Sequence, residues 1–121
     1  YHGAAMPVQH QLASIVAWND EAHVEENRKL YRAKFELFQN ELGQLLPLQK
    51  PDAGFYYWLK VDHDENFAKM LMEKAHIKVL PGRYLSRETE HGNPGEGHVR
   101  MALVADIAQC EEVIKRLKTI L

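Results

Sequence analysis

A segment near the end of the chain constrains the fold most strongly. Residues 97–104 alternate with the period of two that is typical of a half-buried strand. The apolar face of this strand comprises Val99, Met101 and Leu103, and the other face comprises His98, Arg100 and Ala102. Because an unpaired buried charge is costly, Arg100 needs an anionic partner. A carboxylate of the protein would make Arg100 a structural residue, whereas a carboxylate or phosphate of a ligand would make it a binding residue.

The rest of the chain supplies the elements that this strand packs with. Periodicity and turn signals predict helices over 7–18, 20–46, 62–75 and 106–121, and strands over 54–59, 77–80 and 97–104. In the long helix one apolar stripe comprises Val24, Tyr31, Phe35, Phe38, Leu42 and Leu45. Three short strands beside these helices predict an α+β fold, a two-layer sandwich with a small three- to four-stranded sheet.

Acidic residues mark where three of the helices are expected to begin. Asn19–Asp20 offers an N-cap for the long helix, and Asp106 offers one for the last helix. Asp62 followed by Glu65 has the spacing of a capping box. The segment 62–65 also looks like a cation loop, but it lacks the ligand count and the glycine of a calcium loop. Helix capping by Asp62 is therefore the interpretation that we favour.

Composition excludes several functional classes. The chain has 121 residues, enough for a single modest core, and a formal net charge of −2 gives no reason to expect nucleic acid. No apolar run approaches the roughly 20 residues of a membrane span, and no signal peptide is recognisable. The lone Cys110 fits a reducing cytoplasm, and its apolar helical stripe favours a core residue over a nucleophile. The absence of an initial methionine suggests a piece of a longer protein.

Other candidate sites are weaker. The seven histidines lack the spacing of a zinc site, so no metal is expected. The glycines at 92, 95 and 97 do not precede a helix, which favours a hairpin turn over a phosphate loop. Aromatic residues at 55–58 either stack on a ligand or fill the core. From the residues alone, the chain is an α+β domain of undefined activity.

Three motifs in order suggest a family. Asp52–Tyr56, Val79–Gly82 and Val99–Leu103 together resemble the C-terminal domain of class I/II pyridoxal-phosphate (PLP)-dependent aminotransferases of fold type I. The resemblance covers nearly the whole chain. It implies that 1–19 ends the connection to a large domain, that 20–46 is a long interdomain helix and that 47–121 is the small α+β domain. A narrower resemblance, to the succinyldiaminopimelate aminotransferases of bacterial lysine biosynthesis, is carried by segments 1–3, 17–24 with 26–28, 80–88 and 93–95.

The resemblance implies roles for particular residues. Arg100 matches the arginine that binds the substrate α-carboxylate, and Pro81–Gly82 matches the turn that approaches the substrate when the small domain closes. Arg83 and Tyr84, with Arg87, would lie near the substrate entrance. Residues 1–3 would lie close to a dimer-related active site.

The departures from the family pattern imply a division of labour. None of the nine lysines lies in the serine-rich context of the cofactor-binding lysine, and the partner aspartate and the glycine-rich phosphate cup are absent. We therefore expect PLP to be bound by a large domain missing from this chain, within a cytoplasmic homodimer that acts on amino acids and 2-oxo acids. The isolated chain is predicted to be inactive. The alternatives are another class I/II aminotransferase, a β-C–S lyase, or a stand-alone α+β binding module without catalysis.

Overall fold

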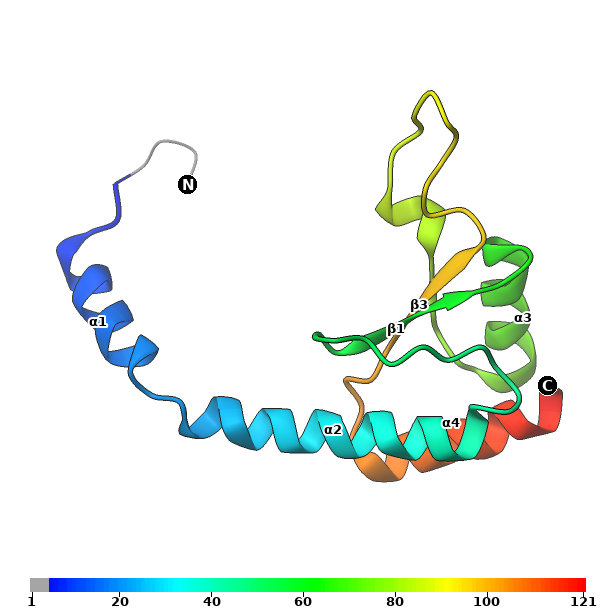
Figure 1. Cartoon of the computed structure of the whole chain (residues 1–121), viewed down its shortest axis with the longest axis horizontal. Coiled ribbons are helices and arrows are strands. Elements are labelled where there is room, and N and C mark those ends of the chain that lie inside the picture. Colours follow the sequence, from blue (N-terminus) through cyan, green and yellow to red (C-terminus); the bar gives the residue numbers. More distant parts are fainter. Residues whose placement is uncertain (1–4) are drawn as a thin grey trace. The chain divides into compact units, whose positions relative to one another are not determined.

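The computed structural model describes residues 5–121, and the chain divides into two compact units between Leu30 and Tyr31. Its elements are α1 (Val8–Trp18), α2 (Ala22–Leu42), β1 (Tyr56–Lys60), α3 (Asp64–Ala75), β2 (Leu80–Pro81), the 3₁₀-helix η1 (Gly82–Leu85), β3 (His98–Ala102) and α4 (Ile107–Ile120) (Figure 1). The division between the units falls within α2. Across residues 5–121 no helix combines the length and the apolar character that a membrane crossing requires.

The first unit consists of α1 and the beginning of α2. Pro7 precedes α1, and its carbonyl accepts hydrogen bonds from the amides of His10 and Gln11. The Asp20 carboxylate accepts a hydrogen bond from the amide of Ala22 at 3.2 Å. Helix α2 begins at Ala22, and the carbonyl of Glu21 accepts its first helical bond from the amide of Glu25, so the N-cap is Glu21, one residue later than predicted. No side chain of α1 is buried. The apolar residues that α1 leaves exposed include Val8, Leu12, Ile15, Val16 and Trp18.

The second unit is built around a three-stranded antiparallel sheet in the order β1–β3–β2. The segment with the clearest alternation thus becomes the central strand. Tyr57 and Leu59 of β1 and Val99 and Met101 of β3 are buried on one face of the sheet. In Figure 1 the later part of α2 runs beside α4, and an ion pair between Glu41 and Lys118 joins these two helices.

Helices α2, α3 and α4 supply the other side of the core. Their buried apolar residues are Phe35, Phe38, Leu42, Leu71, Ala75, Cys110, Ile114 and Leu117. The ring of Tyr57 packs edge-on against Phe35, with 5.0 Å between ring centres, and its hydroxyl donates to the Phe35 carbonyl at 3.1 Å. Burial raises the pKa of Tyr57 to about 12, so the hydroxyl stays a donor. The burial of Cys110 confirms that it is a core residue.

The long helix ends earlier than the sequence predicts. It stops at Leu42, where the amide of Leu45 bonds back to the Leu42 carbonyl three residues earlier and so tightens the last turn. This tighter turn exposes half of Leu45, which was predicted to continue the apolar stripe, and buries Leu46 in its place. The prediction that the helix continues to residue 46 is therefore wrong.

The start of α3 also differs from the prediction. The amide of Val61 donates to the carbonyl of Gly97 at 2.8 Å, which keeps the chain extended beyond the end of β1. Helix α3 therefore begins at Asp64, with an extended His63 at the N-cap and no side-chain cap. The capping role predicted for Asp62 is wrong. By contrast, the Asp106 carboxylate accepts from the amide of Gln109 at 2.8 Å, as predicted for the cap of α4.

Candidate functional site

Arg100 lies on the face of the sheet opposite the core. In the central strand it stands in register with Trp58 of β1 on one side and with Leu80 of β2 on the other. Directly paired residues of neighbouring strands point to the same face, so these three side chains share a surface. Arg100 is half-buried there, and 39% of Trp58 is exposed. The surface is therefore accessible and carries one cation from its central strand.

The charge of Arg100 has no carboxylate partner within residues 5–121. Its guanidinium carbon lies 5.8 Å from the ring centre of Tyr56, which is a cation–π contact. Arg28, Arg83 and Arg116, by contrast, each form an ion pair with a glutamate or an aspartate. Within the described part of the chain, the structural interpretation of Arg100 as an internal ion-pair partner therefore fails.

The Pro81–Gly82 turn packs closely beside this surface. Pro81 is in register with Val99, one residue before Arg100. A Cβ atom on Gly82 would lie 2.2 Å from the carbonyl oxygen of Gly95 and 2.9 Å from the tip of the Trp58 indole. That indole is itself stacked on the ring of His98, with 5.5 Å between ring centres and 11° between planes. Only glycine fits at position 82, and the turn is seated on the aromatic pair.

Arg83 forms ion pairs with three carboxylates of the same unit, of which only Asp64 is buried. Its guanidinium lies 2.7 Å from Asp64, 3.2 Å from Glu65 and 3.2 Å from Glu96. The neighbouring Tyr84 is largely exposed, and its hydroxyl donates to Glu65. The guanidinium of Arg83 is thus paired with carboxylates of the same unit. Arg83 is therefore not included among the proposed substrate-binding residues.

Asp64 is the important residue that sequence reasoning missed. Its side chain is fully buried, and bonds from the side chain and amide of Arg83 hold its pKa well below the usual range for a carboxyl group. The same pair raises the pKa of Arg83, so both groups are charged at neutral pH. One signal was available: Asp64 stands seven residues before Leu71, on the helix face that enters the core.

The Asp64–Arg83 pair predicts how stability depends on pH. Because the pKa of Asp64 is lower in the folded than in the unfolded chain, the pair stabilises the fold fully above the ordinary pKa of about 3.9. That stabilisation is lost as the pH falls from there through the folded-state pKa. In urea unfolding, Asp64→Asn should be less stable than wild type at pH 7, and the difference should shrink below about pH 4. The exposed Asp52→Asn is the matched control, and a difference for Asp64→Asn that stays constant with pH would contradict the assignment.

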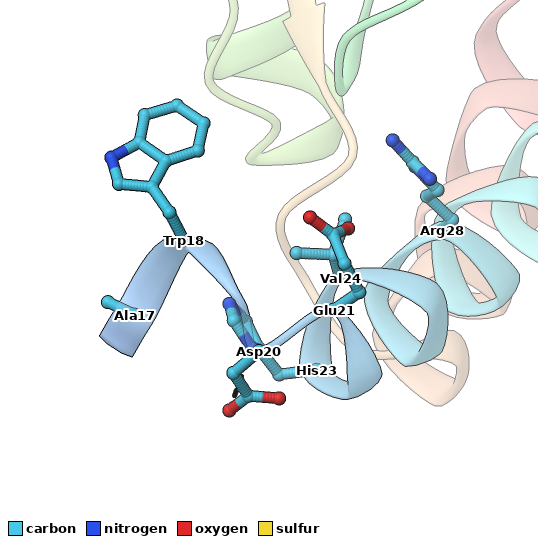
Figure 2. A pocket seen from close by; sticks show the side chains of 7 residues that line it. All are labelled: Ala17, Trp18, Asp20, Glu21, His23, Val24 and Arg28. Carbon is cyan, nitrogen blue, oxygen red and sulfur yellow. Dashed lines mark ion pairs between the residues drawn. The ribbon is translucent and has the colours of Figure 1, made fainter. Parts of the chain in front are cut away.

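A concavity lies in the first unit, at the junction of α1 and α2. Its volume is about 350 Å³, and Ala17, Trp18, Asp20, Glu21, His23, Val24 and Arg28 line it. Figure 2 shows the Trp18 indole and the Arg28 guanidinium on opposite sides of it, and His23 lies 3.6 Å from Asp20. Its charged groups have mixed signs and are largely exposed, so they do not converge on one ligand group.

Two earlier expectations concern other parts of the chain. Within residues 5–121, no group of three or more histidine, cysteine, aspartate or glutamate side chains could hold a metal ion. The expected place of Tyr1, His2 and Gly3 near a dimer-related active site lies outside the described residues.

Comparison with solved structures shows where this fold occurs. An aminotransferase from Neisseria meningitidis Z2491 is 52% identical, with a TM-score of 0.86, and the match covers 100% of this chain and 32% of that chain. A probable N-succinyldiaminopimelate aminotransferase from Thermus thermophilus is 27% identical, with a TM-score of 0.68, covering 85% and 27% of the two chains. The predicted α+β class is thus confirmed as that of the small domain of fold-type I aminotransferases.

Sequence comparison agrees with the structural match. The LL-diaminopimelate aminotransferase of Moorella thermoacetica is 33% identical over 100 residues, which are 79% of this chain and 24% of that protein. Transaminase BacF of Bacillus subtilis is 28% identical over 116 residues, covering 89% and 27%. The chain thus spans about a quarter to a third of the length of these relatives. The model of the family "Aminotransferase class I and II", whose members use PLP, matches residues 3–117, and the chain belongs to this family.

Proposed function

We propose that the protein containing this chain is a PLP-dependent aminotransferase in which Arg100 binds the α-carboxylate of the substrate. The observation that carries this proposal is the half-buried Arg100 without a carboxylate partner in residues 5–121, in a domain of an aminotransferase family. A planar guanidinium forms a bidentate pair with a carboxylate. Such a pair orients the bonds at the substrate Cα, and correct orientation contributes much of the rate.

The neighbours of Arg100 support a site that closes over the bound substrate. We assign the Pro81–Gly82 turn to the part that approaches the substrate when the small domain closes. Its packing against Trp58 and the backbone of Gly95 favours movement of the turn together with the sheet. Tyr84 is exposed beside the turn and remains a candidate for a contact at the entrance. In a ping-pong reaction, Arg100 would bind the carboxylate of each substrate in turn.

Within residues 5–121, the lysines do not fit a cofactor site. Of the nine lysines, eight are exposed, whereas a desolvated pocket lowers the pKa of a lysine and activates it toward an aldehyde. The buried Lys34 donates to the carbonyl of Leu103 at 3.0 Å and lies 4.8 Å from the ring centre of Tyr31. We therefore propose that PLP, which supplies an electron sink when bound, is held by a part of the protein outside this chain.

The isolated chain of 121 residues should consequently neither bind PLP nor transaminate. We expect titration with PLP to produce no saturable visible absorption beyond that of the free cofactor. The protein with its preceding sequence is the positive control and should show such a band. A saturable band from the isolated chain, with a lysine modified after borohydride reduction, would contradict the proposal that PLP is bound outside this chain.

For the substrate we propose N-succinyl-LL-diaminopimelate, with 2-oxoglutarate as the amino acceptor. The support is the resemblance of segments 80–88 and 93–95 to succinyldiaminopimelate aminotransferases, together with the structural likeness to the Thermus protein. A second candidate is LL-diaminopimelate itself, which is favoured by the names of the curated relatives. Both candidates share an α-carboxylate for Arg100, so they differ only at the far end of the substrate.

Donor profiling of the whole protein distinguishes these candidates. We expect kcat/KM for the succinylated donor to exceed that for LL-diaminopimelate by about tenfold, roughly 1.4 kcal/mol in transition-state binding. The reverse ratio would support the second candidate, and a preference for aspartate or an aromatic donor would support another class I/II aminotransferase. Release of pyruvate and ammonia from cystathionine would indicate a β-C–S lyase. No turnover of any donor would leave a non-catalytic binding module.

A further inference from the structure

Asp64 is a buried carboxylate to which the proposed reaction gives no role. Within residues 5–121 it is the only acidic side chain that is buried, and its exposure is 0%. It stands in the first turn of α3, where a carboxylate is favoured by the helix dipole. Burying a charge is costly unless it is paired. The contacts of Asp64 therefore show which part of the fold the buried carboxylate holds in place.

The partner of Asp64 is the residue that follows Gly82. The main-chain amide of Arg83 donates to one oxygen of Asp64 at 3.1 Å. The guanidinium donates from Nε at 2.9 Å and from Nη2 at 2.7 Å to the other oxygen. Asp64 therefore holds both the backbone and the side chain of Arg83, and it attaches the turn to the start of α3.

The other side of the turn is attached to the segment that leads into β3. The Arg83 guanidinium lies 3.2 Å from Glu96. The main-chain carbonyl of Arg83 accepts a hydrogen bond from the side-chain amide of Asn93 at 3.2 Å. The amide of Gly95 donates to the Ser86 hydroxyl at 3.0 Å. Residues 93–96 and 82–86 are thus tied together by several bonds, so the turn is fixed from both sides.

These attachments lie within a few residues of the proposed carboxylate site. Leu80, two residues before Gly82, is in register with Arg100. Glu96, which contacts Arg83, is four residues before Arg100 in the chain. A Cβ on Gly82 would meet the carbonyl of His98 at 2.8 Å, so a small shift of the turn would press on β3 itself.

We propose that Asp64 and Arg83 are positioning residues that hold the Pro81–Gly82 turn at a set place beside Arg100. The inference rests on the proposed function of Arg100, and neither residue of the pair touches the substrate. The fork of a guanidinium fits a carboxylate in a narrow range of geometries, so the pair transmits the position of α3 to the turn. A displacement of about 1 Å near a reacting centre is enough to cost up to a hundredfold in rate.

A double-mutant cycle in the whole protein tests this. Asp64→Asn should lower kcat/KM for the amino donor about tenfold, mainly through KM, once rates are normalised to bound cofactor. In an Arg100→Lys background the same change should lower kcat/KM less than about threefold. The bidentate pair between residue 100 and the substrate carboxylate is then already lost, so the position of the turn beside it matters less. Equal factors in the two backgrounds would overturn the proposal, since a merely structural role predicts additivity.

Two further variants keep the test decisive. Arg83→Lys replaces Asp64→Asn in the cycle if Asp64→Asn fails to fold. It retains the charge but loses the planar guanidinium, so kcat/KM should fall by a smaller factor and the effect should again be non-additive with Arg100→Lys. Glu112→Gln removes the exposed ion pair with Arg116 at 2.9 Å on α4 and should leave kcat/KM unchanged. A loss with Glu112→Gln equal to that with Arg83→Lys would also overturn the proposal.

Hydrogen exchange separates this inference from the proposed function. In Asp64→Asn, peptides covering residues 82–98 should exchange at least about tenfold faster, while those covering β1 should be unchanged. Unchanged exchange over 82–98 would overturn the positioning role, whatever Arg100 does. If exchange accelerates but Arg100→Lys leaves activity intact, the assignment of Arg100 fails and the attachment of the turn by Asp64 stands.

Discussion

Arg100→Lys in the whole protein should lower kcat/KM for amino-acid substrates by about tenfold to a hundredfold, roughly 1.4–2.8 kcal/mol. Lysine keeps the positive charge but cannot form the bidentate pair that orients a carboxylate. Because Arg100 has no ion-pair partner within residues 5–121, the fold should lose less than about 0.5 kcal/mol. Steady-state kinetics and urea unfolding of the same variant therefore separate binding from stability.

The matched control for this variant is Arg116→Lys. Arg116 lies on α4, where it pairs with Glu112 at 2.9 Å, and α4 packs into the core on the face of the sheet opposite Arg100. We expect its kcat/KM to equal that of wild type. If kcat/KM of Arg100→Lys stays within about threefold of wild type, below roughly 0.7 kcal/mol, the assignment of the α-carboxylate clamp is wrong.

Gly82→Ala should lower the free energy of unfolding by about 3 kcal/mol, at the upper end of the usual cost of overpacking. The added methyl group would lie 2.2 Å from the carbonyl oxygen of Gly95 and 2.8 Å from that of His98. Both neighbours are main-chain atoms that bonds of the turn and of β3 hold in place, so the contact is not relieved by a side-chain rotation. Urea unfolding of the 121-residue chain measures the loss.

Two other glycines show whether the contact itself is responsible. At Gly92 a methyl group would meet nothing within 4 Å, and only the positive φ of 91° penalises alanine, by about 1 to 2 kcal/mol. Gly95→Ala would disturb the same contact from the other side, so its effect and that of Gly82→Ala should not add. A loss at Gly82 no larger than the loss at Gly92 would contradict the steric account.

Local sequence patterns determined much of the fold. The alternation in 97–104 predicted a half-buried strand with Val99 and Met101 inward, and β3 has both buried. Asp106 predicted the start of α4, because a cap depends only on residues within one turn. The apolar periodicity of the last helix placed Cys110 in the core. Each of these predictions rests on interactions between near neighbours in the chain, which a sequence displays directly.

The candidate site required the tertiary structure. Periodicity placed Arg100 on a face of the sheet, but the absence of an internal carboxylate partner within residues 5–121 depends on which elements pack around that face. Asp64 and Arg83 are 19 residues apart, and the start of α3 at Asp64 follows from a bond between Val61 and Gly97 across the sheet.

The sequence by itself therefore determined the α+β class, the strand near the end of the chain and the face of that strand on which Arg100 lies. Only the tertiary structure decided that the charge of Arg83 is used inside the domain while that of Arg100 stays without a carboxylate partner in residues 5–121. The physical reason is that hydrophobic periodicity is a property of one segment. The partner of a charge, in contrast, is set by segments that meet only when the chain has folded.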